Sequence, residues 1–184
     1  AWRGPILDRA LQQFLADVYW GDLDFLLVDL PPGTGDVALS LGQKLPNAEV
    51  LVVTTPQQAA AEVAERAGTM ASMLEQRVLG VVENMAYLDV TCPDCGETHR
   101  VDVFGSGGGE AVAETLTERL GYEVPLLAEI PMDPAMSAAG DEGVPLVATD
   151  PTHPSAVALS GVADLLASRR ISLIGKSLNL TPVG

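Results

Sequence analysis

Two cysteines, Cys92 and Cys95, lie in the segment C-P-D-C-G and are the only cysteines of the chain. A turn of this kind points two thiolates at one metal ion and directs backbone amides at the sulfurs, as in zinc knuckles and iron–sulfur sites. Such sites normally take four ligands, so two remain to be supplied. Three interpretations are open: a site shared by two chains across a two-fold axis, a site completed locally by His99 and another group, or a redox dithiol.

A shared site is the interpretation that these residues favour, because four thiolates from a symmetric dimer suit a 4Fe-4S cluster and need no other ligand. A redox dithiol would be expected at the N-terminus of a helix that follows a strand. The cysteines are flanked instead by Val90-Thr91 and by residues 100–104, which are typical of the arms of a hairpin. We therefore expect a metal-binding hairpin, with His99 as an exposed residue of one arm rather than a ligand.

A carboxylate, Asp29, follows the apolar run of residues 25–28 and precedes the segment P-P-G-T-G-D, which ends at Asp36. Such a run is typical of a strand that is buried on both faces of a sheet. An aspartate at the end of such a strand can orient a magnesium ion, and a glycine amide of the following loop can meet a γ-phosphate. Because an ordinary turn does not need two prolines and two glycines together, the segment predicts the Walker B half of a phosphate site.

The other half of a phosphate site, a lysine-bearing glycine loop, is expected to be absent from this chain. Gly175-Lys176-Ser177 resembles the end of such a loop, but Arg170 stands five residues before Gly175, where the motif requires glycine. The glycine-rich residues 104–109 contain no lysine and follow the hairpin rather than a core strand. We expect them to be a flexible lead into a helix that lets the hairpin move.

Short apolar runs alternate with helical patterns along the chain. Strands are predicted at residues 24–29, 49–54, 78–82 and 125–130, and helices at 5–18, 57–76, 108–120, 134–143 and 154–169. This alternation predicts an α/β fold, in which a mostly parallel sheet is covered by helices on both faces.

Polar residues follow the predicted strands, at the edge where ligands of such sheets bind. They are Asp29, Thr54-Thr55, Asn84 and the segment 131–133, and they predict a single crevice. The amide of Asn84 could read both the donor and the acceptor edge of an adenine base.

The length and charge of the chain limit its function. Its 184 residues, 47% of them apolar, suit one globular domain. The 10 basic and 25 acidic residues give a net charge of -15, which repels nucleic acids and anionic lipids. No apolar run approaches the roughly 20 residues that span a bilayer. We therefore predict a cytoplasmic protein that binds neither nucleic acids nor membranes, although a compact nucleotide can still bind through local backbone amides.

Seven segments in this order resemble the Mrp family of iron–sulfur cluster carrier ATPases, which belongs to the MinD/ParA-like branch of P-loop NTPases. The resemblance covers residues 1–166, and the ordered combination is highly specific. The segments are WRGP (2–5), DFLLVDLPPGTGD (24–36), VTTPQ (53–57), GVVENM (80–85), CPDCG (92–96), FGSGGG (104–109) and IPMDP (130–134).

The resemblance implies an ATP-binding homodimer that uses Mg²⁺, holds a bridging 4Fe-4S cluster and passes it to apo iron–sulfur proteins. Cys92 and Cys95 of each chain match the cluster ligands, and Asp29 matches the Walker B aspartate. The segment from Gly33 to Asp36 matches the switch region that senses the γ-phosphate. The residues that match the position of the adenine are Asn84 and the loop from Pro131 to Asp133.

Members of this family carry a lysine-bearing P-loop before the WRGP segment. We therefore expect residues 1–170 to be the C-terminal part of an NTPase domain, with a cysteine hairpin at about 87–104 and a tail at 171–184. The sheet of this part would lack the strand that feeds the P-loop, so ATP hydrolysis is expected of the full-length parent and not of this part alone.

Two other classes of protein remain as alternatives. A partition or positioning ATPase would be expected to carry a basic tail or DNA-binding face, but the tail holds few basic residues, Arg169, Arg170 and Lys176. A zinc-stabilised interaction module without catalysis would use the same cysteines.

Overall fold

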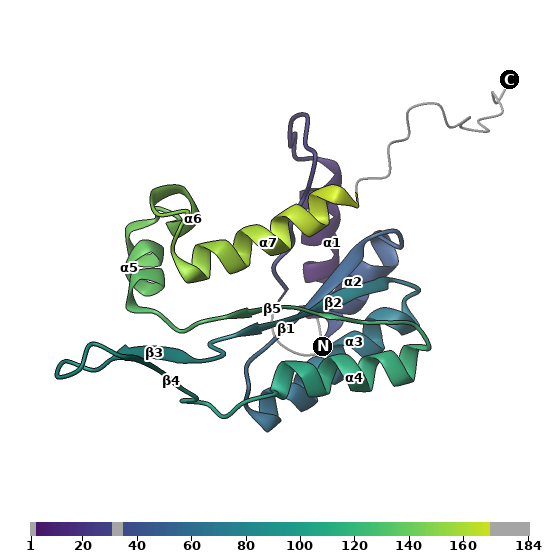
Figure 1. Cartoon of the computed structure of the whole chain (residues 1–184). Coiled ribbons are helices and arrows are strands. Elements are labelled where there is room, and N and C mark those ends of the chain that lie inside the picture. Colours follow the sequence, from purple (N-terminus) through teal and green to yellow (C-terminus); the bar gives the residue numbers. More distant parts are fainter. Residues whose placement is uncertain (1–2, 31–34, 170–184) are drawn as a thin grey trace, which may run out of the picture.

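The computed structural model describes residues 3–30 and 35–169 (Figure 1). Within these residues the chain alternates between helices and strands, as the sequence predicts. In chain order the elements are α1 (Arg3–Ala16), α2 (Asp36–Lys44), β1 (Glu49–Thr54), α3 (Gln58–Met73), β2 (Arg77–Asn84), β3 (Leu88–Thr91), β4 (Thr98–Val101), α4 (Gly108–Leu120), β5 (Leu126–Ile130), α5 (Pro134–Glu142), α6 (Leu146–Thr149) and α7 (Pro154–Ser168).

A three-stranded parallel sheet, ordered β1-β2-β5, forms the centre of the fold. The strand β2 lies in the middle, and its residues 78–83 are all buried. Because parallel strands need long crossovers, each connection carries a helix: α3 joins β1 to β2, and α4 lies between β2 and β5. The carboxyl ends of the three strands therefore meet at one edge, where Thr54 pairs with Glu83 and Asn84 pairs with Ile130.

Helices cover both faces of the sheet, which confirms the predicted α/β architecture. The helices α3 and α4 pack on one face and α7 packs on the other (Figure 1). Small residues allow α3 and α4 to approach closely: a Cβ atom on Gly68 of α3 would lie 2.7 Å from a methyl carbon of Leu116 on α4. On the other face Val82, Ile130 and Val162 form a smaller cluster between the sheet and α7.

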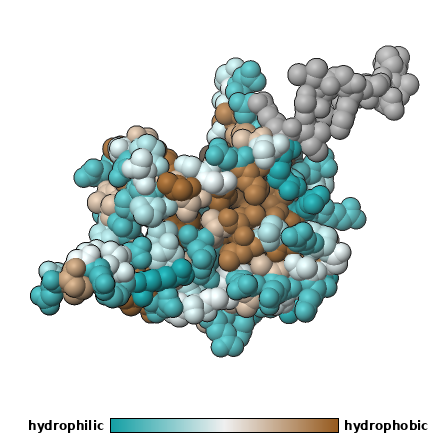
Figure 2. Space-filling view, viewed as in Figure 1, coloured by the Kyte–Doolittle hydropathy of each residue, from teal (hydrophilic) through white to brown (hydrophobic). Residues whose placement is uncertain are grey.

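The predicted strand at residues 24–29 is wrong. Residues 25–30 form no strand in the structure, and the sheet β1-β2-β5 does not include them. Their apolar side chains are largely exposed, with Leu27 at 81%. An apolar run becomes a buried strand only where neighbouring strands take its backbone hydrogen bonds and helices cover its faces. Figure 2 shows hydrophobic surface gathered in the middle of the molecule, below α7.

The strands β3 and β4 form a separate antiparallel hairpin that extends away from the body of the fold (Figure 1). Its register pairs Leu88 with Val101 and Val90 with His99. The hairpin predicted around the two cysteines is therefore confirmed. The predicted tail at 171–184 lies outside the described residues. Within the described part of the chain, no helix combines the length and apolar character that crossing a membrane requires.

Candidate functional site at the cysteine hairpin and the adjoining sheet edge

The two cysteines lie in the tight turn that closes the hairpin. The backbone amide of Cys92 donates to the carbonyl of Glu97 (2.8 Å), and the amide of Gly96 donates to the carbonyl of Cys92 (2.9 Å). Gly96 has a φ of +73°, which a residue with a side chain rarely adopts, and this explains the glycine of the C-P-D-C-G segment. Cys92 is half-buried and Cys95 is exposed, so the turn presents sulfur atoms at the far end of the hairpin.

The local backbone favours the thiolate form of Cys92. The amide of Cys95 makes the largest contribution to lowering the pKa of the Cys92 thiol, followed by the amide of Asp94 and the side chain of Cys95. Donors aimed at a sulfur stabilise its negative charge, and the thiolate is the form that binds metals. This is the arrangement of amides that the sequence predicts for the turn.

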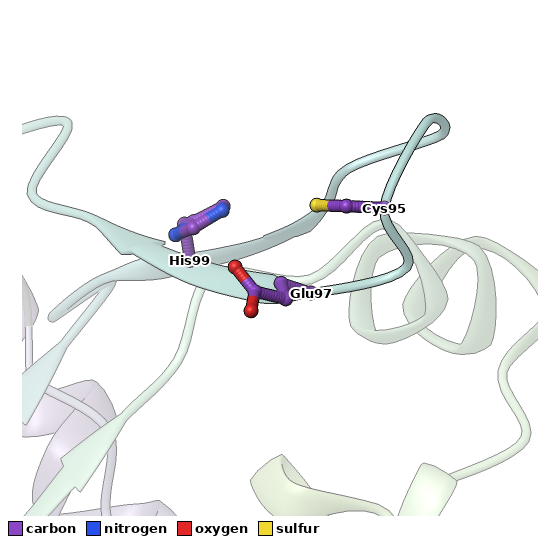
Figure 3. A group of neighbouring side chains, drawn as sticks. All are labelled: Cys95, Glu97 and His99. Atoms are coloured by element: carbon purple, nitrogen blue, oxygen red, sulfur yellow. The ribbon is translucent and has the colours of Figure 1, made fainter.

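A third feature of the turn is a group of three possible metal ligands, Cys95, Glu97 and His99 (Figure 3). Their ligand atoms lie within 4.8 Å of one another, and all three residues are exposed. The prediction that His99 is exposed is confirmed, but the structure also places its ring beside two other ligand types. The sequence analysis did not identify Glu97 as a candidate ligand. Its spacing of two residues from both Cys95 and His99 could have indicated it.

The base of the hairpin is fixed to the sheet through Arg100. The guanidinium carbon of Arg100 lies 3.8 Å from the centre of the Tyr87 ring, which is a cation–π contact. The same group pairs with Glu129 of β5 (3.2 Å) and with Asp102 (3.4 Å). These contacts join the two arms to each other and to the edge of the central sheet.

The chain enters the hairpin from the carboxyl end of β2, next to the loop after β5. The Oδ1 atom of Asn84 accepts a hydrogen bond from the amide of Met85, which has a φ of +54°. The amide of Ala86 then donates to Ile130 (2.9 Å), and the amide of Met132 donates to Tyr87 (2.7 Å). The structure therefore brings Asn84 close to the 131–133 loop, as the predicted crevice requires.

Asp133, at the end of this loop, holds two helices together. Its Oδ1 atom accepts from the amide of Ala135 (2.7 Å) and caps α5, and its Oδ2 atom lies 3.3 Å from Nε2 of His153. The Nδ1 atom of His153 accepts in turn from the amide of Ser155 at the start of α7. The two carboxylate oxygens of Asp133 thus contact the first residues of α5 and the residue that precedes α7.

The chain leaves the hairpin through two glycines that are packed tightly against the sheet edge, and not through a flexible lead. Gly108 and Gly109 begin α4 and are buried. A Cβ atom on Gly108 would overlap the carbonyl of Pro56, and one on Gly109 would lie 2.8 Å from Cβ of Glu83. The expectation of flexibility at residues 104–109 is thus wrong for these two positions, because their missing side chains make room for a close approach.

Glu83 is a second residue near the candidate site that the sequence analysis missed. Its side chain is only 1% exposed, and its Oε2 atom accepts a hydrogen bond from the amide of Gly109. A carboxylate is stabilised by the free amides at the start of a helix. An acidic residue inside an otherwise apolar strand was the available signal.

The remaining predicted site residues come from the segment that leads into α2 and from its first residue. Asp29 is exposed and belongs to residues 25–30, so it does not lie at the end of a strand of the sheet. Gly33 lies outside the described residues, and Asp36 is the first residue of α2. A groove of about 630 Å³ lies at the opposite edge of the sheet, lined among others by Glu49 and Arg77 at the beginnings of β1 and β2. The predicted single crevice that includes Asp29 therefore stays a prediction.

Comparison with known proteins identifies the family. The family described as NUBPL iron-transfer P-loop NTPase, of the ParA type, matches residues 1–167. The chain belongs to this family. Curated relatives named iron–sulfur cluster carrier protein are similar to it: that of Mycobacterium tuberculosis is 62% identical over 181 residues, and that of Deinococcus radiodurans is 46% identical over 168 residues. The matches cover 98% and 91% of this chain but 46% and 45% of these relatives, so the chain spans about half their length.

Solved structures agree with this assignment. A nucleotide-binding protein from Archaeoglobus fulgidus, in complex with ADP and containing cobalt, is 40% identical with a TM-score of 0.59, over 75% of this chain and 53% of that one. The septum site-determining protein MinD of Pyrococcus horikoshii, complexed with Mg-ADP, has a TM-score of 0.59 at 23% identity, over 94% of this chain and 58% of that one, which shows the fold alone. The predicted P-loop NTPase-like fold of the MinD type is confirmed.

Proposed function

We propose that this chain is the cluster-holding part of an ATP-dependent iron–sulfur cluster carrier. Two copies together hold one 4Fe-4S cluster as cargo, through Cys92 and Cys95 of each copy, and deliver it to apo iron–sulfur proteins. The observation that carries this proposal is the turn at the end of the hairpin, where both sulfurs lie at or near the surface. A second copy can approach such a turn without moving the body of the fold.

The nucleotide part of the proposal uses the carboxyl edge of the sheet. Asn84 and the loop with Pro131 and Asp133 would hold the adenine, since these segments lie side by side. The family resemblance, rather than a position at this edge, assigns Asp29 to the Mg²⁺ ion next to the phosphates, and Gly33 and Asp36 to the switch that senses the γ-phosphate. Support for ATP comes from the Archaeoglobus relative that binds ADP.

Both ends of the hairpin are tied to this same edge, which suggests how nucleotide could act on the cluster. The first arm starts beside Asn84, and the second arm leads into Gly109, which is held by Glu83. A shift of the strand ends on ATP binding would therefore move both arms together. We propose that this movement changes the geometry in which the two copies present the cluster.

We propose a domain organisation that agrees with this division of roles. Residues 1–170 would form part of one cytoplasmic NTPase domain, with residues 171–184 as a tail, and the ATPase activity would belong to the longer parent. Adding ATP to this chain alone would then yield no phosphate release above background, whereas the parent protein would hydrolyse ATP in the presence of Mg²⁺.

Anaerobic reconstitution with iron and sulfide tests the carrier proposal. We expect four iron atoms per two chains, a shift from monomer to dimer on cluster binding, and transfer of the cluster to an apo-protein that requires one. The variants Cys92→Ser and Cys95→Ser should each lose the cluster, because two of four thiolates disappear from the dimer. Thr98→Ala, which alters a neighbouring exposed residue of the same hairpin, is the matched control and should bind a full cluster.

Retention of the cluster by either cysteine variant would overturn this assignment. So would a reconstituted protein that binds its iron as a monomer, since one chain supplies only two thiolates.

A further inference from the structure

The hairpin of one chain places three different ligand types around one point. The sulfur of Cys95, a carboxylate oxygen of Glu97 and a ring nitrogen of His99 lie within 4.8 Å of one another (Figure 3). Ligands of a tetrahedral zinc ion lie about 2.0–2.3 Å from the metal, and hence roughly 3.6 Å from each other. Closing the present group around an ion thus requires a movement of about 1 Å, which side-chain rotation can supply.

The alternation of side chains along the second arm of the hairpin explains why these three side chains meet. Alternate residues of an extended segment point to the same side, so Glu97 and His99 share one side of the second arm, and Arg100 points to the other. On that other side of the arm, Arg100 contacts Tyr87 and Glu129. The side with Glu97 and His99 is left exposed, and the turn directs Cys95 toward it (Figure 3).

The ligand set selects a class of metal ion. Thiolate and imidazole favour borderline ions such as Zn²⁺ and Fe²⁺, whereas Mg²⁺ and Ca²⁺ prefer oxygen ligands. Three protein ligands leave one tetrahedral position open, which is typical of sites that exchange a ligand rather than of closed structural sites. The strong negative charge of the chain adds a favourable field for a cation.

We propose that Cys95, Glu97 and His99 of a single chain form a mononuclear site for Zn²⁺ or Fe²⁺. Binding releases the thiol proton of Cys95 to solvent, while the neutral ring of His99 and the carboxylate of Glu97 bind as they are. Cys92 is not a ligand of this site. Because Cys95 cannot serve both sites at once, the mononuclear ion and the bridging cluster exclude each other. This mutual exclusion rests on the proposed carrier function.

Titration of the metal-free protein with Co²⁺, an optical substitute for Zn²⁺, tests the site directly. We expect one Co²⁺ per chain, with absorbance of a thiolate-bound tetrahedral ion and an affinity that does not depend on protein concentration. Addition of Zn²⁺ should displace the Co²⁺, whereas Mg²⁺ and Ca²⁺ should not.

Single substitutions test the contribution of each proposed ligand to Co²⁺ binding. Cys95→Ser should abolish the thiolate absorbance. Replacing a residue that only holds a metal ligand in place typically costs 10–100-fold in metal affinity. Because Glu97 and His99 are proposed as ligands themselves, Glu97→Ala and His99→Ala should each weaken Co²⁺ binding by about tenfold or more. Thr98→Ala, between these two residues, is the matched control and should bind Co²⁺ like the unmodified protein.

Cys92→Ser distinguishes this site from the cluster site. It should lose the 4Fe-4S cluster but still bind Co²⁺ with thiolate absorbance. A Cys92→Ser protein that loses Co²⁺ as completely as Cys95→Ser, a stoichiometry of one Co²⁺ per two chains, or unchanged affinity in both Glu97→Ala and His99→Ala would each overturn the mononuclear site. Failure to reconstitute a cluster in a protein that binds Co²⁺ normally would instead refute the carrier function alone.

Discussion

The buried carboxylate of Glu83, in the central strand β2, accepts a hydrogen bond from the backbone amide of Gly109 in the first turn of α4. These two residues lie 26 positions apart, and the whole cysteine hairpin is inserted between them. Their contact closes the base of that insertion. It also fixes the start of α4 against the strand end that precedes Asn84.

Removing the acceptor at Glu83 should destabilise the fold. Glu83→Leu leaves the buried amide of Gly109 without a partner, which costs about 1–3 kcal/mol. Glu83→Gln keeps an acceptor oxygen and should cost less. Urea denaturation measures the free energy of unfolding, and Glu114→Gln, an exposed residue of α4, is the matched control. Equal stability of Glu83→Leu and the unmodified protein would show that the contact contributes nothing.

The close approach of α4 to the sheet can be tested with an added methyl group. In Gly109→Ala the new Cβ atom would lie 2.8 Å from Cβ of Glu83, and such overpacking costs about 1–3 kcal/mol. Gly161→Ala places the same methyl group in α7, where nothing beyond the adjoining backbone of the helix lies within 4 Å, and should be neutral or stabilising. The midpoint of thermal unfolding should therefore fall in Gly109→Ala but not in Gly161→Ala, and equal shifts would contradict tight packing at Gly109.

Arg100 should control how firmly the hairpin is held. Arg100→Ala removes the contact with the Tyr87 ring and the ion pairs with Glu129 and Asp102, worth roughly 1 kcal/mol together at an exposed site. Amide hydrogen exchange in β3 and β4 should become several-fold faster, while exchange in β1 and β2 stays unchanged. Arg66→Ala, which removes an exposed arginine from α3, should leave the exchange of the hairpin as it is.

Asp133 should contribute to stability as the cap of α5. Asp133→Ala removes the acceptor of the Ala135 amide and the partner of His153, and loss of a cap costs about 0.5–2 kcal/mol. Asp133→Asn retains an oxygen acceptor and should lose less. Asp141→Ala, near the other end of the same helix, is the control. Chemical denaturation in which Asp133→Ala and Asp141→Ala unfold alike would argue against the cap.

The reactivity of Cys92 should depend on pH in a way set by its turn. The amides of Cys95 and Asp94 lower the pKa of the Cys92 thiol, so its thiolate persists to lower pH in the folded protein than in the unfolded chain. In metal-free protein, the pH midpoint of Cys92 alkylation, followed by peptide mass spectrometry, should lie below the midpoint in urea. A midpoint that is equal or higher in the folded protein would contradict the hydrogen bonds to the sulfur.

Much of the fold could be predicted because its signals are local. The runs at 49–54 and 125–130, the helix at 108–120 and the hairpin around the C-P-D-C-G turn all depend on patterns within a few residues. Turn residues act in the same way, as Gly96 illustrates with its positive φ. The order of short strands and helices then leaves few alternatives to a parallel sheet covered on both faces.

The sequence by itself thus determined most of the helices and strands, although not the helices α2 and α6, and which two thiols could bind a metal, because backbone conformation and side-chain chemistry are largely decided over short distances. Only the tertiary structure decided that Glu83 meets Gly109, that Glu97 and His99 join Cys95, and that residues 25–30 remain outside the sheet. Whether an apolar run is buried, or a carboxylate finds an amide, depends on neighbours supplied by other parts of the chain, and no pattern within the segment itself contains them.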